Sequence, residues 1–367
     1  MIRHTVSDRI ITQIALAVFT IIFISCAGGG RIESSDPIAS TAAASASEFV
    51  ERPFHPFLGD EWIGDAISYG CYREGQAPHK QGPSEAEILE DLTILKDHWN
   101  LIRVYGSDLG MNSDMVLKVI HENKLPIRVM LGIWLTNESL HPERRPDNQT
   151  EVLRGIELAN KYPEEVIAVN VGNETQVWWS GHRMNPDTLI SYIRQVRQSV
   201  SMPVTTADDY NFWNKPESQA IADEIDFIVL HAYALWNGQQ LENAMSWTDS
   251  VYQDILTRHP TKTIALGETG WATTYNPAKK QPWEQGALIK GEVGIEAQEY
   301  FLRDLNQWIQ EKQVTTFLFE AFDEPWKGGG DESGPTEVEK HWGVFYKDRT
   351  PKPSLENYLS SLNKETE

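Results

Sequence analysis

Short apolar runs alternate with helical patterns eight times in this chain, and this alternation constrains its fold more than any other feature. The runs are continuous rather than alternating in polarity, which is typical of parallel strands buried on both faces. We therefore predict an α/β protein that forms a single (β/α)8 TIM barrel over residues 56–365, with functional residues at the carboxyl ends of its strands. The predicted strands are residues 66–72, 101–105, 126–133, 166–174, 203–207, 226–231, 263–268 and 315–320.

The helical patterns between these runs carry recognisable start signals. Ser84 and Glu87 form a capping-box pattern, and Asn185 stands before a proline at the first helical position. Apolar residues then recur at helical spacing after each start. A long pattern over residues 295–312 predicts the seventh helix, and the last helix is expected near residues 354–362.

Two of the predicted strands end in a carboxylate close to a glycine. The run Leu-Gly-Glu-Thr-Gly-Trp (266–271) closes the seventh strand, and Val-Gly-Asn-Glu (171–174) closes the fourth. Because the carboxyl ends of parallel strands meet at one mouth of a barrel, we expect Glu174 and Glu268 to lie near each other there. Enzymes that hydrolyse a glycosidic bond typically use two such carboxyl groups.

Aromatic and polar side chains follow the other predicted strands. The chain has 13 Trp, which suits a surface on which sugar rings stack, with core packing as the alternative for many of the rings. His231 either orients a carboxylate or is a structural histidine, and Asp208 and Asp209 are either site residues or ordinary loop acids. The candidate substrate-binding residues are Tyr72, Arg73, Tyr105, Asn173, Tyr233, Trp271, Glu320, Phe322, Asp323, Glu324, Trp326 and Lys327.

Several motifs together resemble microbial members of glycoside hydrolase family 17, the β-1,3-glucanases and β-1,3-glucanosyltransferases. The resemblance lies in the two carboxylate motifs above and in the loop after the first strand, Tyr-Arg-Glu-Gly-Gln-Ala-Pro (72–78). It also includes Phe-Glu-Ala-Phe-Asp-Glu-Pro-Trp-Lys (319–327) and His-Trp-Gly (341–343). It extends from about Ile67 to Pro353, which is nearly the whole predicted barrel.

The resemblance implies retention of anomeric configuration, an endo-type cleft, Glu268 as nucleophile and Glu174 as acid/base. A retaining enzyme holds its two carboxyl groups about 5–5.5 Å apart. Glu174 must be protonated when the bond breaks, so we expect its surroundings to raise its pKa. We expect Asn173 to hydrogen-bond the sugar 2-hydroxyl, and Lys327 with Glu324 to balance charge around the nucleophile.

Acidic residues outnumber basic ones by 53 to 32, and the net charge is −21. This argues against nucleic acid and an anionic membrane surface as partners, and a neutral β-glucan polysaccharide or oligosaccharide meets no such repulsion. The 10 histidines show no His-Glu-x-x-His pattern, so neither a metal nor another cofactor is expected. The two cysteines, Cys26 and Cys71, do not make a disulfide framework. We expect Cys71 to be buried and the protein to be a monomer.

Residues 1–26 have the features of a lipoprotein-type signal peptide: a basic start, an apolar stretch and a small residue, Ser25, before Cys26. The cysteine resembles the lipidation site of a bacterial lipobox, although Phe23 stands where leucine is usual; an ordinary signal peptide or an uncleaved anchor is the alternative. Residues 27–55 are expected to form a disordered tether. We therefore expect an exported bacterial protein of the cell envelope, attached to a membrane only through a lipid on Cys26.

Three functional hypotheses follow from these residues. The first is a retaining endo-β-1,3-glucanase that hydrolyses laminarin-like glucan by double displacement. The second is a β-1,3-glucanosyltransferase, which would use the same residues with a sugar acceptor in place of water. The third is a non-catalytic glycan-binding lipoprotein, against which the intact pair Glu174 and Glu268 argues, because a binding module has no use for two such carboxylates.

Overall fold

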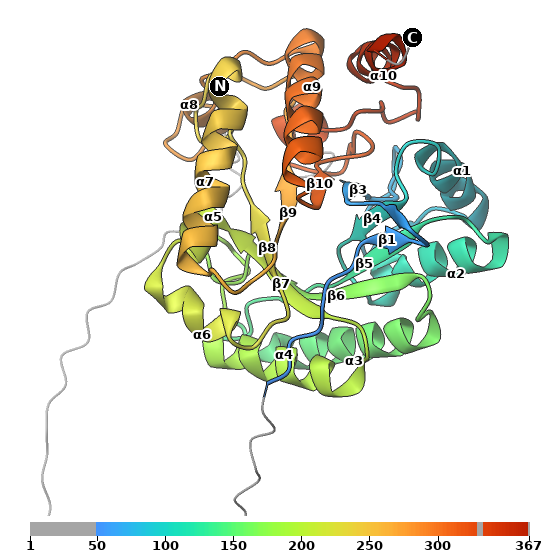
Figure 1. The fold of residues 1–367 in the computed structure, drawn as a ribbon, viewed down its shortest axis with the longest axis vertical. Coiled ribbons are helices and arrows are strands. Elements are labelled where there is room, and N and C mark those ends of the chain that lie inside the picture. Colours follow the sequence, from blue (N-terminus) through green and yellow to red (C-terminus); the bar gives the residue numbers. More distant parts are fainter. Residues whose placement is uncertain (1–48, 329–332, 366–367) are drawn as a thin grey trace, which may run out of the picture. The chain divides into compact units, whose positions relative to one another are not determined.

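Eight parallel strands form a closed barrel that helices surround (Figure 1). The computed structural model describes residues 49–328 and 333–365. The last strand of the barrel pairs with the first, in the order β10, β3, β4, β5, β6, β7, β8, β9, which confirms the predicted (β/α)8 TIM barrel. The strands are β3 (Asp65–Ser68), β4 (Leu101–Val104), β5 (Arg128–Ile133), β6 (Val166–Asn173), β7 (Val204–Asp209), β8 (Ile228–His231), β9 (Ile264–Thr269) and β10 (Thr316–Leu318).

The helices begin where the sequence signals predict. The Ser84 side chain accepts the main-chain N–H of Glu87, and the Glu87 carboxylate accepts the N–H of Ser84, which completes the capping box. The Asn185 side chain caps a helix that has Pro186 in its first turn. The helices are α1 (Glu85–Leu95), α2 (Ser113–Asn123), α3 (Arg145–Lys161), α4 (Pro186–Ser199), α5 (Tyr210–Trp213), α6 (Gln219–Ala222), α7 (Ala244–Arg258), α8 (Gln285–Leu288), α9 (Ile295–Lys312) and α10 (Pro353–Glu365).

The first and last barrel strands are shorter than predicted. β3 stops at Ser68 and β10 at Leu318, although apolar residues continue after both. The chain leaves the ladder after Leu318, where the peptide between Phe319 and Glu320 is cis. There the N–H of Val344 donates to the carbonyl of Glu320. The C-terminal loop therefore supplies part of the hydrogen bonding, while the N–H groups of Phe319 and Ala321 still donate to the carbonyls of Thr269 and Ser68.

A short segment ahead of the barrel closes its amino-terminal end. β1 (Phe57–Leu58) and β2 (Glu61–Trp62) form an antiparallel hairpin that the sequence analysis did not predict. The ring of Phe54 stacks on Phe227 with the ring centroids 4.2 Å apart. It thereby covers the apolar cluster inside the barrel, which includes Phe317.

The residues just before the hairpin are also fixed to the barrel. The Arg52 guanidinium donates to the carbonyls of Val200 and Met202, both at 3.0 Å. Its main-chain N–H donates to the Asp226 carboxylate at 2.8 Å. These contacts correct the predicted boundary: residues 49–55 belong to the barrel domain and not to the tether, because they carry the aromatic and hydrogen-bonding groups that a tether lacks.

The predicted signal peptide, Cys26 and the rest of the predicted tether lie outside the described residues. Within the described ranges, no helix combines the length and the apolar character needed to cross a membrane. Cys71 is free and buried, as predicted.

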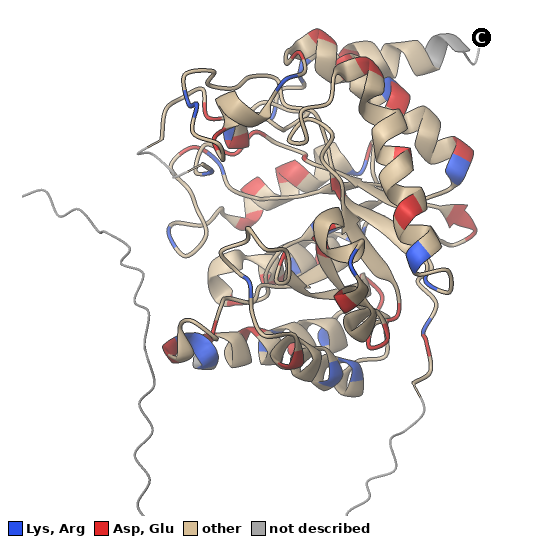
Figure 2. Ribbon diagram, turned by 90° about the vertical axis from the view of Figure 1, so that its left-hand side faces the viewer, with Lys and Arg blue, Asp and Glu red and all other residues tan. Residues whose placement is uncertain are grey.

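Acidic side chains are spread over the molecule rather than gathered in one place. Figure 2 shows Asp and Glu on several helices and loops of one side of the barrel, with Lys and Arg between them. The net charge of −21 therefore acts as a general repulsion toward polyanions and does not mark a binding site.

The Arg52 contacts predict that the segment before the hairpin contributes to stability. Arg52→Ala removes hydrogen bonds to buried carbonyl groups and should lower the free energy of unfolding by about 2 kcal/mol. As a control, Arg303→Ala breaks an exposed ion pair with Glu299 within one helix and should cost less than about 0.5 kcal/mol. Urea unfolding measures both variants, and equal effects would show that residues 49–55 are not part of the folded domain.

Candidate active site

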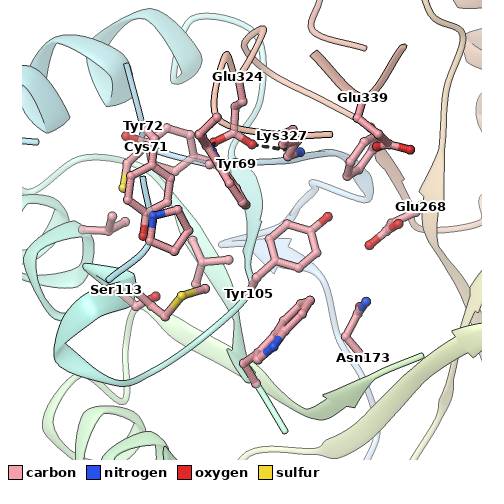
Figure 3. Close-up of a pocket in the computed structure, with 18 of the residues that line it drawn as sticks. Tyr69, Cys71, Tyr72, Tyr105, Ser113, Asn173, Glu268, Glu324, Lys327 and Glu339 are labelled. Atoms are coloured by element: carbon pink, nitrogen blue, oxygen red, sulfur yellow. Dashed lines mark hydrogen bonds and ion pairs between the residues drawn. The ribbon is translucent and has the colours of Figure 1, made fainter. Parts of the chain in front are cut away.

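A cleft with a volume of about 410 Å³ lies at the carboxyl ends of the strands (Figure 3). Six aromatic side chains are among its walls, together with polar groups that include Asn173, Glu174 and Glu268, a mixture that is usual for a ligand pocket. A second pocket of about 350 Å³ adjoins the cleft and shares His79, Met111 and Trp134 with it. Residues lining the cleft include Tyr69, Tyr72, Tyr105, Trp134, Asn173, Glu174, Glu268, Phe319, Glu324, Trp326, Lys327 and Glu339.

The two predicted carboxylates lie close together in this cleft. One oxygen of Glu174, one oxygen of Glu268 and a ring nitrogen of His231 all lie within 4.8 Å of one another. His231 lies between the acids, with Nδ1 3.0 Å from Glu174 and Nε2 3.5 Å from Glu268. His231 therefore lies where a residue that orients a carboxylate is expected, which is one of the two interpretations given from the sequence.

Two glycines shape the strand ends that carry these acids. Gly172 has a φ of +82°, and Glu174 itself has a φ of +51°, in the left-handed region that costs a non-glycine residue about 1 kcal/mol. This turn directs the Glu174 side chain out of the line of β6. At Gly267, a Cβ would lie 2.2 Å from the Val229 side chain and 3.1 Å from His231. Glycine there lets β8 and its histidine approach β9 closely.

Glu268 is held as a carboxylate. Arg103 Nη1 donates to one oxygen at 2.8 Å, and the Tyr233 hydroxyl donates to the other at 2.7 Å. Burial alone would raise the pKa of Glu268, but His231, Arg103 and the Tyr233 hydrogen bond together lower it below its usual value. Burial lowers the pKa of His231 to about 4, so the guanidinium of Arg103 is the cation that acts at neutral pH.

Glu174 has the opposite electrostatic surroundings. Burial, followed by the negative charges of Glu268 and Asp209, raises the pKa of Glu174 well above its usual value. Its side chain keeps 18% of its surface exposed, so it opens into the cleft while Glu268 keeps 8%. The surroundings therefore move the pKa values of the two acids in opposite directions, which favours a protonated Glu174 and an ionised Glu268. Such a difference identifies which carboxyl group can act as the acid.

Arg103 also fixes the side chain of Asn173. Arg103 Nη2 donates to Asn173 Oδ1 at 2.6 Å, and because guanidinium has no acceptor, the amide oxygen must face it. The amide nitrogen is then turned toward the cleft, where Figure 3 shows it near Glu268 and Tyr105. This geometry suits the predicted contact with a sugar hydroxyl.

A buried ion cluster borders the cleft on the side of β10. Lys327 Nζ lies 2.8 Å from Glu324 and also binds Glu320, and Trp326 Nε1 donates to Glu324 at 2.9 Å. Burial opposes the charge of Lys327, but Glu320 and Glu324 raise its pKa. Lys327 is therefore paired with both Glu320 and Glu324, and its role in balancing charge around Glu268 stays a prediction.

Seven of the twelve predicted substrate-binding residues lie at the cleft. Six of them line it, and Tyr233 contacts the Glu268 carboxylate. The hydroxyl of Tyr72 donates to the carbonyl of Gly110, which fixes the ring. The six lining residues are Tyr72, Tyr105, Asn173, Glu324, Trp326 and Lys327.

The other five do not line the cleft, and each makes internal contacts instead. Trp271 stacks on Phe301 and donates its Nε1–H to the carbonyl of Glu292. Arg73 binds Asp91 at 2.6 Å. Because residues just past a strand end still face alternate sides of the sheet, only some of them point into the mouth. The five residues are Arg73, Trp271, Glu320, Phe322 and Asp323.

The three of these that follow β10 are buried and contact other side chains of the protein. Phe322 packs edge-on against Tyr69 with the ring centroids 6.1 Å apart. The Asp323 carboxylate accepts a hydrogen bond from Lys352 at 2.8 Å, and Glu320 binds Lys327 from below. None of the three lines the cleft, and their predicted contact with substrate stays a prediction.

The sequence analysis missed Arg103, Tyr69 and Glu339. A charged residue inside the apolar run of the second strand was a signal for Arg103, whereas nothing in the pattern distinguished Tyr69 or Glu339. Asp208 and Asp209 are the buried last residues of β7 and not loop acids. Asp208 accepts the N–H groups of Gln176 and Val177, and Asp209 caps α5.

The donor atoms of Glu174, His231 and Glu268 are close enough together to be tested as a metal site. A cation there would compete with the guanidinium of Arg103, which is already 2.8 Å from Glu268. A bound cation would also require an ionised Glu174, whereas the surroundings of Glu174 raise its pKa and favour the protonated form. This donor set fits paired acid–base chemistry and does not fit a resident metal ion.

Solved structures with the same fold include two enzymes. An endo-laminarinase from Formosa Hel1_33_131 has a TM-score of 0.70 and 24% sequence identity, and the match covers 82% of this chain and 88% of that chain. A glycoside hydrolase family 17 β-1,3-glucanosyltransferase from Rhizomucor miehei has a TM-score of 0.63 and 24% identity, with 79% and 96% covered. At this identity the likeness concerns the fold.

Sequence relatives extend over most of the chain. A putative glucan endo-1,3-beta-glucosidase, btgC, from Aspergillus niger is 28% identical over 288 residues, which cover 74% of this chain and 40% of that protein. A glucan 1,3-beta-glucosidase from Schizosaccharomyces pombe is 26% identical over 281 residues, with 73% and 80% covered. The chain thus spans well under half the length of the Aspergillus relative.

A family model described as the BtgE/BtgC glycoside hydrolase domain matches residues 66–343. That span begins at the second residue of β3 and ends in the C-terminal loop, so it contains nearly all of β3, the other seven barrel strands and both carboxylates. Because the match covers most of the sequence and the whole site, the chain belongs to the family of the BtgE/BtgC glycoside hydrolase domain.

Proposed function

We propose that the protein is a retaining endo-glycosidase of the family 17 type that hydrolyses β-1,3-glucan, with Glu268 as nucleophile and Glu174 as acid/base. The observation that carries the proposal is the approach of the two carboxyl groups to within 4.8 Å, with opposite protonation. An inverting enzyme needs about 6.5–9.5 Å to place a water between them. The shorter separation supports double displacement through a covalent intermediate.

In the first step, Glu268 attacks the anomeric carbon while Glu174 gives its proton to the glycosidic oxygen. The bond between that oxygen and the anomeric carbon breaks, and the leaving chain departs with a new hydroxyl. Arg103 and Tyr233 hold both Glu268 oxygens before the attack, so the nucleophile is oriented in advance. The amide nitrogen of Asn173 is available to the sugar 2-hydroxyl, where contacts strengthen in the transition state.

In the second step, Glu174 acts as a base. Once Glu268 is esterified, its negative charge is gone, and that charge is one of the causes that raise the pKa of Glu174. The pKa of Glu174 therefore falls after the first step, and the carboxylate left behind can take a proton from water. The water attacks the anomeric carbon, Glu268 leaves, and both groups return to their starting protonation.

The substrate class rests on the walls of the cleft and on the relatives. Tyr69, Tyr105 and Trp326 offer apolar ring faces without a net charge, and a neutral glucan meets no repulsion from the acidic protein. The activities for which the Aspergillus niger and Formosa proteins are named support a β-1,3-linked glucan. The second pocket, which adjoins the cleft at Trp134, favours internal cleavage, because a chain can continue past the catalytic pair.

Transfer to a sugar is the second candidate function. A glucanosyltransferase performs the same first step, and a sugar hydroxyl then replaces water as the acceptor in the second. The Rhizomucor miehei enzyme, which shares the fold, is a β-1,3-glucanosyltransferase. The two functions differ in their products: hydrolysis gives only shorter chains, whereas transfer also gives chains longer than the donor.

The main test incubates laminarin with the wild-type protein and with Glu268→Gln, followed by sizing of the products. The wild type should release a series of oligosaccharides, and Glu268→Gln should lose more than about 10³-fold in kcat because the amide cannot attack. The variant should still bind laminarin, since its side chain keeps the shape of the original. Retention of more than a few per cent of turnover would refute the nucleophile assignment, and wild-type inactivity on laminarin would refute the substrate.

The hydrogen bond from Tyr233 to Glu268 predicts that the pH dependence of activity changes when the tyrosine hydroxyl is removed. Glu268 must be ionised to attack, so activity is lost as pH falls through its pKa; Glu174 must be protonated, so activity is lost as pH rises through its pKa. Tyr233→Phe removes a hydrogen bond that lowers the pKa of Glu268. The acidic limb of kcat/KM should therefore move to higher pH, and kcat/KM at neutral pH should fall about tenfold.

The control for this pH profile is Tyr210→Phe, which removes a hydroxyl bonded to Asn237 and not to a carboxylate. Its profile should match that of the wild type. An unmoved acidic limb in Tyr233→Phe would mean that the tyrosine does not stabilise the ionised form of Glu268.

A further inference from the structure

We propose that Trp178 and Trp179 form a stacking platform for the part of the glucan that leaves in the first step, and for a sugar acceptor that enters in the second. This inference rests on the proposed function and extends it to the leaving-group side of the same site. It concerns a loop that takes no part in the chemistry described above.

The two tryptophans lie in the loop of residues 175–184, which joins β6 to α4. The base of the loop is closed, because the N–H of Met184 donates to the carbonyl of Thr175 at 2.9 Å. The N–H groups of Gln176 and Val177 donate to the Asp208 carboxylate at 2.7 and 3.1 Å. The loop is therefore tied to the barrel at its start and closed on itself at its end.

The indole rings remain outside this anchored base. Trp178 exposes 73% of its surface and Trp179 exposes 47%, while Val177 beside them exposes 1%. Within the described part of the chain, neither indole has a ring contact or a hydrogen bond. Two adjacent exposed tryptophans are costly in water, and they resemble the aromatic residues that dominate binding surfaces.

The loop borders the catalytic cleft on the acid/base side. It begins directly after Glu174, and its His182 packs edge-on against Trp134 with the ring centroids 4.7 Å apart. Trp134 lines the cleft. Because Glu174 must touch the oxygen of the leaving sugar, the departing chain lies against Glu174 and next to the loop that follows it.

The chemistry of the platform suits β-1,3-glucan. A β-glucose ring carries its hydroxyl groups around the edge and C–H groups on both faces, so a flat indole packs on a face and excludes water there. The indole N–H can also reach a hydroxyl. No charge is needed, which agrees with a neutral polymer. In transfer, the held acceptor gives its hydroxyl proton to Glu174 as the new bond to the anomeric carbon forms and the bond to Glu268 breaks.

The test compares two substrates with the double variant Trp178→Ala/Trp179→Ala. For laminarihexaose, whose leaving group is an oligosaccharide, kcat/KM should fall about tenfold. For an aryl β-laminaribioside, whose leaving group is a small aryl alcohol, it should stay unchanged. The share of products longer than the donor should fall as well, and Trp178→Phe/Trp179→Phe should restore most of the loss.

Trp283→Ala is the matched control, because Trp283 is 74% exposed in the loop after β9. It should alter neither substrate. An equal loss on both substrates, or no loss on either, would overturn the platform. A change in oligomeric state with unaltered cleavage would assign the rings to a second copy of the chain and would overturn it too.

Failure of the proposed function has a separate readout. If the wild type cleaves neither substrate, calorimetric titration with laminarihexaose still tests the platform, because the alanine double variant should bind about tenfold more weakly than Trp283→Ala. Equal affinities of these two variants would reject the platform independently of any activity.

Discussion

The site depends on one buried guanidinium. Arg103 on β4 binds the Glu268 carboxylate and the Gly267 carbonyl on β9, and the amide oxygen of Asn173 on β6. Its guanidinium also lies 4.6 Å from the centroid of the Tyr105 ring. A buried cation is tolerated when such partners surround it, and removing it would leave a buried carboxylate uncompensated, at a cost of about 3–5 kcal/mol. The same charge keeps Glu268 ionised, so stability and catalysis share this interaction.

The barrel and the close approach of Glu174 and Glu268 could be predicted from the sequence because each rests on a local signal. Eight continuous apolar runs and the helix starts between them specify the alternation of strands and helices. A carboxylate at the carboxyl end of a parallel strand lies at the mouth of the barrel. Glu174 and Glu268 follow from that geometry. The tyrosines after the first, second and sixth strands, Tyr72, Tyr105 and Tyr233, also lie at the site for the same reason.

The positions of the remaining side chains could not be predicted, because the direction of each side chain depends on backbone turns that the sequence pattern does not reveal. Asp323 and Glu324 are neighbours after β10, yet Asp323 binds the buried Lys352 and Glu324 lines the cleft. Trp271 stands in a motif with Glu268 but packs against Phe301 of α9. Arg52 resembled a tether residue because its partners are carbonyl groups about 150 residues away in the chain.

The central claim is that Glu268 and Glu174 act in turn on one covalent intermediate, and Glu174→Ala with an aryl β-laminaribioside tests it most directly. A good leaving group needs no proton, so the intermediate should form and then wait for a base. Azide needs no base, and it should restore turnover and release a β-glycosyl azide, because two inversions at the anomeric carbon retain the configuration. An α-glycosyl azide, or no rescue in a folded variant, would contradict the account.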